Sequence, residues 1–461
     1  MKKVAILGLD CATPQLVFDE WKSDLKNLNS LMESGTYKKL RSTIPPITVP
    51  AWTAMMTSKD PGTLGFYGFR NREAYDYSSL YFANAKYVKD KTVWNYMSRS
   101  RKKSLVFGVP QTYPPKPLNG MLVASFLTPS KEVQFTWPDD VKAELDQAAD
   151  GDYMIDVEEF RTENKDQLLG EIYKMTERRW KAYRHFYKKE EPDFSIVVEM
   201  GVDRIHHGFW RYYDKEHRLY EPGNRYENAI KDYYLALDEE IGKTLTLFDD
   251  DTLVLVVSDH GAKTMHGAIC VNEWMQKEGY LKLKEQPKEQ VRMKNDMVDW
   301  SGTKAWGEGG YYSRIFFNVE GREPEGVIKK EEYDDFREEI KAKLEAITDE
   351  DGNNIGTKVF KPEEIYREVK NVPPDLIVYF GDLNWRSAGS VGTGQIHMYE
   401  NDTGPDDANH AQDGIIIANL PPDRMVEADD HYSIYDVAPT VLSWCGIEVP
   451  GDMIGRNLLK G

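Results

Sequence analysis

The sequence is poor in cysteine, in basic charge and in long apolar runs, and each shortage excludes a class of protein. Three cysteines, Cys11, Cys270 and Cys445, are too few for a disulfide framework or a thiolate metal site, which indicates a reduced, cytoplasmic protein. The 59 basic residues are outnumbered by 77 acidic ones, and the net charge of −18 argues against a nucleic-acid polymer or an anionic membrane as partner. No apolar run reaches the roughly 18 residues of a membrane span, so we expect a soluble protein.

What the sequence does contain is enough apolar material for a substantial core, with 40% hydrophobic and 12% aromatic residues. Short apolar runs predict buried strands, and because they are continuous rather than alternating they favour a sheet covered on both faces. These runs are Val4–Gly8, Ser104–Val109, Met121–Ser125, Phe194–Val198, Leu253–Val257, Leu376–Phe380 and Ile415–Ile417. Amphipathic helical stripes lie between them, in residues 168–186, 226–248 and 336–347.

This alternation predicts an α/β fold, with a central, mostly parallel sheet and helices on both faces. We expect residues 1–461 to form a single domain, with insertions near residues 128–164 and 285–400, where loop-rich and polar stretches lie. The glycine-rich run at residues 389–394 lacks the lysine and the strand-to-helix context of a phosphate-binding loop. We therefore interpret that run as a flexible loop.

Carboxylates follow several of the predicted strands. Asp10 comes directly after the first strand, Asp203 a few residues after Phe194–Val198, and Asp259-His260 just after Leu253–Val257. A single Asp in such a place is usually a turn or cap residue. However, ligands collect at the strand ends of α/β sheets, and two of these carboxylates have a histidine close by. The pattern therefore predicts a metal site.

Asp203 and His207 are four residues apart, which puts both side chains on one face of a helix. An Asp oxygen together with a His nitrogen suits zinc or another borderline divalent ion. The neighbouring His206 would point elsewhere. His410 is a further candidate ligand, although a lone histidine in a predicted loop is more often a surface residue.

Thr48 lies in Thr48-Val49-Pro50-Ala51-Trp52-Thr53, where a helix is expected to start. A threonine hydroxyl has no acidity at neutral pH, so it can act as a nucleophile only if a base or a metal activates it. Two neighbouring ions could stabilise both the attacking and the leaving oxygen of an in-line displacement. The plain alternative is a helix N-terminus with Trp52 packed inward, and the two interpretations are compatible.

Taken in order, these motifs resemble the alkaline phosphatase superfamily, and most closely its type I phosphodiesterase/nucleotide pyrophosphatase family. The resemblance spans almost the whole chain and implies an alkaline phosphatase-like fold. The matching pieces are Gly8-Leu9-Asp10, Thr48-Val49-Pro50 with Thr57 and Gly65, Asp203-x-x-x-His207, Ser258-Asp259-His260-Gly261, His410 before Gly414-Ile415, and Ser433 to Thr440.

The resemblance also implies a division of ligands between two divalent metal ions, zinc in most members and manganese or iron in others. One ion would be held by Asp10, Thr48, Asp259 and His260, and the other by Asp203, His207 and His410. In the implied mechanism Thr48 attacks phosphorus, a covalent phosphothreonine forms, and water hydrolyses it.

One position departs from the family pattern. Many nucleotide pyrophosphatases carry an asparagine shortly after the glycine that matches Gly65, where it binds a phosphoryl oxygen, and here that position is Phe69. Arg70 or Asn71 could make the contact instead, since guanidinium pairs well with phosphate. A cation at this place would favour the more highly charged monoesters.

We therefore predict a metal-dependent hydrolase of phosphodiester bonds, nucleotide pyrophosphates among them, that acts on a small phosphorylated substrate. A phosphomonoesterase or a phosphotransferase/mutase of the same superfamily is the alternative reaction. Sulfatases and cofactor-independent phosphoglycerate mutases rank lower, because Thr48 can neither form the sulfatase aldehyde nor match the serine of the mutases. An inactive metal- or phosphate-binding protein is the alternative from outside the enzymes.

Overall fold

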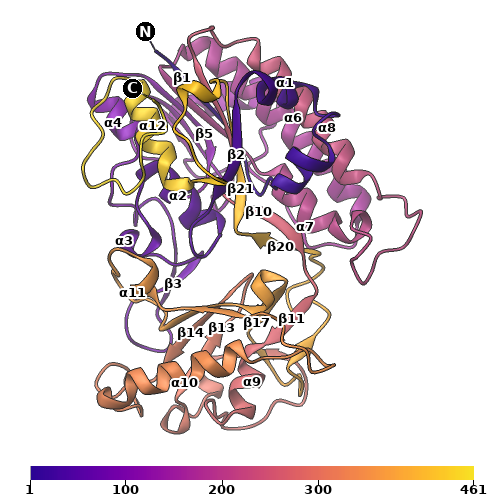
Figure 1. Ribbon diagram of the computed structural model, residues 1–461, viewed down its shortest axis with the longest axis vertical. Coiled ribbons are helices and arrows are strands. Elements are labelled where there is room, and N and C mark those ends of the chain that lie inside the picture. The colour runs from indigo at the N-terminus through magenta and orange to yellow at the C-terminus, as the bar shows by residue number, and fades with distance from the viewer. Residues whose placement is uncertain (1, 461) are drawn as a thin grey trace.

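The computed structural model describes residues 2–460 and shows a larger α/β lobe joined to a smaller second lobe (Figure 1). Within residues 2–460 the larger lobe is built on a nine-stranded sheet in the order β22-β2-β21-β9-β1-β8-β5-β6-β7. Only β21 and β7 run against the direction of the rest, so the prediction of a mostly parallel sheet is confirmed. The strands are β1 (Val4–Leu9), β2 (Thr36–Arg41), β5 (Ser104–Val109), β6 (Gly120–Ala124), β7 (Thr136–Trp137), β8 (Phe194–Glu199), β9 (Leu253–Val257), β21 (Asp413–Ala418) and β22 (His431–Ser433).

Helices cover both faces of this sheet, as predicted (Figure 1). One layer consists of α1 (Lys26–Ser34), α6 (Lys165–Glu190), α7 (Gly201–Tyr213) and α8 (Ala229–Leu245). The other consists of α2 (Thr48–Thr57), α4 (Val93–Arg99) and α12 (Val437–Trp444). The inner strands β1, β5, β8 and β9 are completely buried, which explains why their sequences are continuously apolar rather than alternating.

The second lobe has its own apolar core, formed by residues from Ile269 to Trp385. It contains an antiparallel sheet in the order β13-β14-β16-β15 and is covered by helices. Its main elements are α9 (Val271–Lys277), β13 (Ala305–Glu308), β14 (Ser313–Phe317), α10 (Tyr333–Glu345), β15 (Lys358–Phe360) and β16 (Leu376–Tyr379).

One strand assignment from the sequence is wrong. The run Leu376–Phe380 was expected in the central sheet, but β16 pairs with β14 and β15 in the second lobe. A continuous apolar run indicates burial on both faces, and the core of the second lobe supplies that burial as well as the central sheet would.

The predicted insertion near residues 285–400 falls largely within the second lobe, whose core already begins at Ile269. Residues 128–164 contain little regular structure and add β7 to the edge of the central sheet. We propose that the chain is one domain with the second lobe as an insertion in it. Among residues 2–460 no helix has the length and apolar character needed to cross a membrane.

The two lobes and the segments between them also contain shorter helices and strands. They are α3 (Pro61–Leu64), β3 (Arg70–Arg72), β4 (Leu80–Phe82), α5 (Lys142–Ala148), β10 (Gly261–Thr264), β11 (Gly267–Cys270), β12 (Val291–Arg292), α11 (Pro362–Ile365), β17 (Trp385–Ala388), β18 (Ser390–Val391), β19 (His397–Met398) and β20 (Ala408–Ala411).

Candidate functional site

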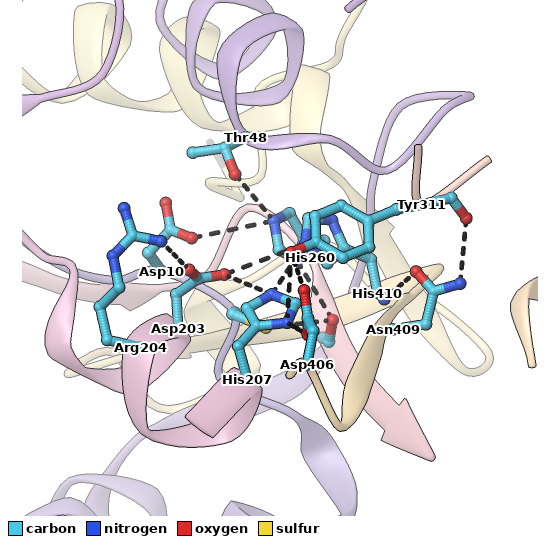
Figure 2. A network of polar contacts seen from close by, with 12 residues as sticks. Asp10, Thr48, Asp203, Arg204, His207, His260, Tyr311, Asp406, Asn409 and His410 are labelled. Atoms are coloured by element: carbon cyan, nitrogen blue, oxygen red, sulfur yellow. Dashed lines mark hydrogen bonds and ion pairs between the residues drawn. The ribbon is translucent and has the colours of Figure 1, made fainter. Parts of the chain in front are cut away.

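The structure brings the predicted ligand residues together at the carboxyl ends of the central strands, and each is at most 3% exposed (Figure 2). Neighbouring strands β1 and β9 end at two of the motifs, and α7 follows β8 directly. Thr48 is the first residue of α2. His410 lies in β20, which pairs with β10. The residues are Asp10, Thr48, Asp203, His207, Asp259, His260 and His410.

The first group of atoms surrounds the Nε2 atom of His260. That nitrogen lies 3.2 Å from Oγ1 of Thr48 and 3.2 Å from Oδ2 of Asp259. It lies 3.8 Å from Oδ1 of Asp10. Ligands bound tetrahedrally at roughly 2.0 to 2.1 Å from a zinc ion are separated by about 3.3 Å, so the three oxygens lie at about the distance from Nε2 of His260 that ligands of one ion would have.

A second group lies beside the first and includes two residues of α7. Oδ1 of Asp203 is 3.2 Å from Nε2 of His207 and 3.9 Å from Nε2 of His410. The two imidazole nitrogens are 3.3 Å apart. The other carboxylate oxygen of Asp203 accepts a 2.6 Å hydrogen bond from Arg204, which fixes the direction of the side chain. This second group also has the spacing of a metal site.

Asp10 and Asp259 each use one carboxylate oxygen for a protein donor and leave the other without one. Oδ2 of Asp10 accepts from the Trp52 indole N–H at 2.6 Å, and Oδ1 of Asp259 accepts from the backbone N–H of Cys11 at 3.2 Å. Within residues 2–460, Oδ1 of Asp10 and Oδ2 of Asp259 have no hydrogen-bond partner although both are buried. Burial, followed by repulsion from neighbouring carboxylates, raises the pKa of both groups well above the ordinary range. Buried and unpartnered oxygens of this kind fit a cation.

The three histidines of the cluster are oriented by hydrogen bonds at their Nδ1 atoms. Each Nδ1 faces an acceptor, so we assign the proton to Nδ1 and the lone pair to Nε2, which points into the cluster. The acceptors are Oδ1 of Asp406 for His207 (2.7 Å), the carbonyl of Gly261 for His260 (3.1 Å) and the carbonyl of Pro46 for His410 (2.8 Å). Metal-binding histidines in proteins are typically held in this way.

His260 and His410 are uncharged at neutral pH, as a cation requires, whereas His207 is protonated. Burial lowers the pKa of His260 to about 4 and, together with the two neighbouring histidines, lowers that of His410 well below its usual value. Burial also opposes a charge on His207, but the carboxylates of Asp406 and Asp203 outweigh it and raise the pKa of His207 to about 9. A cation bound at His207 would therefore have to displace a proton at neutral pH.

Cys11 also approaches the second group, since its sulfur lies within 4.8 Å of ligand atoms of Asp203 and His207. Burial and the surrounding carboxylates raise the pKa of this thiol well above its ordinary value. Because a thiol binds metals as the thiolate, the structure favours Cys11 as a packed neutral side chain.

The sequence did not indicate three further residues that support the site. The ring of Tyr311 stacks on His410 and His207, with centroids 4.3 and 4.8 Å apart, and its hydroxyl donates to Asp406 at 2.9 Å. Arg161 donates to the same carboxylate at 3.0 Å. Tyr311 belongs to the second lobe, so no local pattern near the ligands could have revealed it.

The remaining candidates lie apart from the cluster. The side chain of Asn71 accepts from the Tyr67 N–H at 2.7 Å and donates to the Gly68 carbonyl at 2.9 Å, so it holds a turn. Arg70 lies with its guanidinium 5.2 Å from the ring centroid of Phe82, and the roles predicted for Arg70 and Asn71 remain predictions. His206 points away, as expected, with Nε2 3.2 Å from the Tyr234 hydroxyl.

Comparison with known proteins identifies a family and a fold. The sequence matches the family described as type I phosphodiesterase / nucleotide pyrophosphatase over residues 4–406, a match that ends just before His410. No curated protein sequence matches the chain.

Solved structures with 11 to 15% identity share the fold. Phosphonoacetate hydrolase from Sinorhizobium meliloti 1021, in complex with phosphonoformate, has a TM-score of 0.64 at 15% identity, with 96% of each chain covered. Human ectonucleotide pyrophosphatase / phosphodiesterase 5 has a TM-score of 0.55 at 11% identity, and an inactive form of the murine protein with AMP has 0.54 at 13%. Both cover 100% of the two chains compared.

Proposed function

The chain belongs to the type I phosphodiesterase/nucleotide pyrophosphatase family, and from this premise we propose that it hydrolyses phosphodiester bonds with Thr48 as its nucleophile. Family membership makes it a phosphoric ester hydrolase of the alkaline phosphatase superfamily. The observation that carries the proposal for Thr48 is the 3.2 Å distance from its Oγ1 to Nε2 of His260, beside the unpartnered oxygens of Asp10 and Asp259.

Two divalent cations are the cofactors we propose. The first would be held by Asp10, Thr48, Asp259 and His260, and the second by Asp203, His207 and His410. Mixed oxygen and nitrogen donors favour zinc, with manganese or iron as alternatives. When bound, such ions promote loss of the nucleophile's proton and offset the charge on the phosphoryl oxygens.

In the proposed reaction Oγ1 of Thr48 forms a bond to phosphorus while the bond from phosphorus to the leaving ester oxygen breaks. The product is a covalent phosphothreonine, which water then hydrolyses. Thr48 is the first residue of α2, where the unpaired amide N–H groups and the helix dipole favour an anion. Arg204, bonded to Asp203, serves to orient that carboxylate.

Turnover of bis(p-nitrophenyl) phosphate by the protein supplied with zinc or manganese tests this proposal. Thr48→Ala should reduce kcat/KM by at least about a thousandfold. Thr53→Ala is the matched control, because its hydroxyl bonds to Gln111 rather than facing the cluster. Full activity of Thr48→Ala would remove Thr48 as nucleophile. Faster turnover of p-nitrophenyl phosphate would instead favour the phosphomonoesterase alternative.

We also propose that the protein works in the cytoplasm. Cys11, Cys270 and Cys445 are all free and buried in the structure, as suits a reducing compartment. Cell fractionation that recovers the native protein only outside the cytoplasm would refute this location.

A further inference from the structure

The backbone just before Thr48 is held by hydrogen bonds to every one of its carbonyl groups. We call residues 42–47 the leading segment. Pro45 and Pro46 have no N–H, so this segment depends on its carbonyls to fix its path. The donors are the side-chain amide of Gln412 for Ser42 and Thr43, the hydroxyl of Tyr366 for Ile44, the hydroxyl of Thr43 and the N–H of Ile47 for Pro45, Nδ1 of His410 for Pro46, and the N–H of Ala51 for Ile47.

Tyr366 makes its hydrogen bond to the leading segment from the second lobe. It directly follows α11, and its hydroxyl donates to the carbonyl of Ile44 at 2.5 Å. The side chain is buried, so water does not readily replace this bond. Gly62 of α3 permits the close approach, because a Cβ there would lie 2.6 Å from the Cβ of Tyr366. Tyr366 is therefore packed against the larger lobe as well as bonded to it.

The ring of Tyr366 acts on the same stretch of backbone as its hydroxyl. It belongs to a buried apolar cluster that also contains Ile47, the residue directly before Thr48. Ile47 is the extended N-cap residue of α2, so its position sets where the helix and Thr48 begin. Oγ1 of Thr48 then lies 3.2 Å from Nε2 of His260. One side chain of the second lobe thus contacts both Ile44 and the cluster around Ile47.

We propose that Tyr366 is a positioning residue for Thr48, which it acts on through the leading segment. The inference rests on the proposed function, in which Oγ1 of Thr48 attacks phosphorus. Tyr366 touches neither the substrate nor the ligand groups. Its hydroxyl keeps the leading segment in the one path that presents Oγ1 to the phosphorus, and a displacement of about 1 Å at a reacting atom can lower the rate about a hundredfold.

Tyr366→Phe tests the role, because it removes the hydroxyl and keeps the ring in its cluster. In the zinc-loaded protein kcat for bis(p-nitrophenyl) phosphate should fall about tenfold, while KM stays within about twofold of the native value. The attack is impaired but substrate binding is not. Hydrogen exchange should also become about tenfold faster in residues 47–51, where the amides of Ile47 and Ala51 are hydrogen-bonded, because the segment opens locally more often.

Tyr67→Phe is the matched control. Tyr67 is buried in the same cluster, and its ring centroid lies 5.9 Å from that of Tyr366. Its hydroxyl donates at 2.6 Å to the carbonyl of Lys370, so the substitution also removes a hydrogen bond between the two lobes. The acceptor lies outside the leading segment, however. Tyr67→Phe should therefore keep kcat, KM and the exchange of residues 47–51 close to their native values.

The outcomes separate this inference from the proposed function. An active enzyme whose kcat is unchanged in Tyr366→Phe would overturn the positioning role and leave the hydrolase proposal intact. Equal losses of kcat in the two variants would assign the effect to general weakening between the lobes and also overturn it. Faster exchange in Tyr366→Phe alone, in a protein whose native form turns over no phosphodiester, would support the anchoring of the leading segment and overturn the hydrolase proposal.

Discussion

Single residues next to the cluster orient its histidines by accepting hydrogen bonds from their Nδ1 atoms. His207 is the clearest case, because its Nδ1 faces a carboxylate and not a backbone carbonyl as in His260 and His410. A carboxylate partner both fixes the ring and increases the basicity of the opposite nitrogen. Asp406 is therefore a positioning residue, and its effect can be separated from that of its neighbour Asp407.

Asp406→Asn should weaken zinc binding at the second group by about 10- to 100-fold. The substitution keeps the size of the side chain but removes the charge that helps to raise the pKa of His207 to about 9. Proton competition for His207 should then begin at a lower pH than in the native protein. Competition with a chromogenic chelator across a pH series measures both effects.

Asp407→Asn provides the control for that measurement. Asp407 approaches His207 only through a backbone hydrogen bond of 3.0 Å, which the substitution preserves. An equal loss of affinity in the two variants, or an unchanged pH profile in Asp406→Asn, would contradict the positioning role.

The sequence could suggest the ligand residues because each follows a strand or shares a helix face with another candidate. The sequence could not suggest the hydrogen-bond acceptors that orient these ligands. Asp406 is 199 positions from His207, and the acceptors of His260 and His410 are backbone carbonyls, which any residue possesses. Side-chain identity carries information about direct ligands but very little about the groups that orient them.

At the scale of helices and strands, continuous apolar runs predicted which strands are buried. They predicted less well which sheet each strand joins. The run of β16 shows the limit, because a buried strand in either lobe has the same composition. The sequence does not predict β2, because this strand contains Lys38 and Lys39 and has no continuous apolar run. Its residues are partly buried and partly exposed. His410 was expected in a loop but lies in β20, whose four residues are too short and polar to give a strand signal.

Glu199, the last residue of β8, is a buried carboxyl group whose effect on stability can be tested. Glu199 accepts from the N–H of Gly201 at 2.7 Å and from the Trp180 indole at 2.9 Å. Burial raises its pKa despite the nearby guanidinium of Arg179. The folded state therefore holds the proton more tightly than the unfolded state, and this group's contribution to stability falls as the pH rises above the ordinary value of about 4.3.

Glu199→Gln should consequently gain stability relative to the native protein between pH 5 and pH 8. The gain between these two pH values is about 1.4 kcal/mol for each unit by which the pKa of Glu199 in the folded state exceeds 5. The amide can change the free energy of unfolding by an amount that does not depend on pH. That amount cancels when the difference between the two proteins at pH 5 is subtracted from the difference at pH 8. Urea unfolding of both proteins at each pH measures the difference, and a difference independent of pH would refute the assignment.

At the scale of the whole molecule, the proposed ligands all come from the larger lobe, yet the second lobe reaches them through Tyr311 (Figure 2). This residue lies between β13 and β14, and its backbone carbonyl accepts a 3.0 Å hydrogen bond from Asn409, next to His410. We therefore predict that the state of the metal centre is coupled to the order of this segment of the second lobe.

Metal addition should therefore slow hydrogen exchange in residues 308–312 as well as around the ligands. A cation that orders His207 and His410 stabilises the surface on which the Tyr311 ring stacks, and binding to the folded state suppresses local opening. Amides of α10, which packs against β15 and β16 within the second lobe, serve as the internal control. In Tyr311→Ala the ligands should still gain protection with zinc while residues 308–312 should not. Equal protection of that segment in Tyr311→Ala and in the native protein would show that another contact joins the lobes.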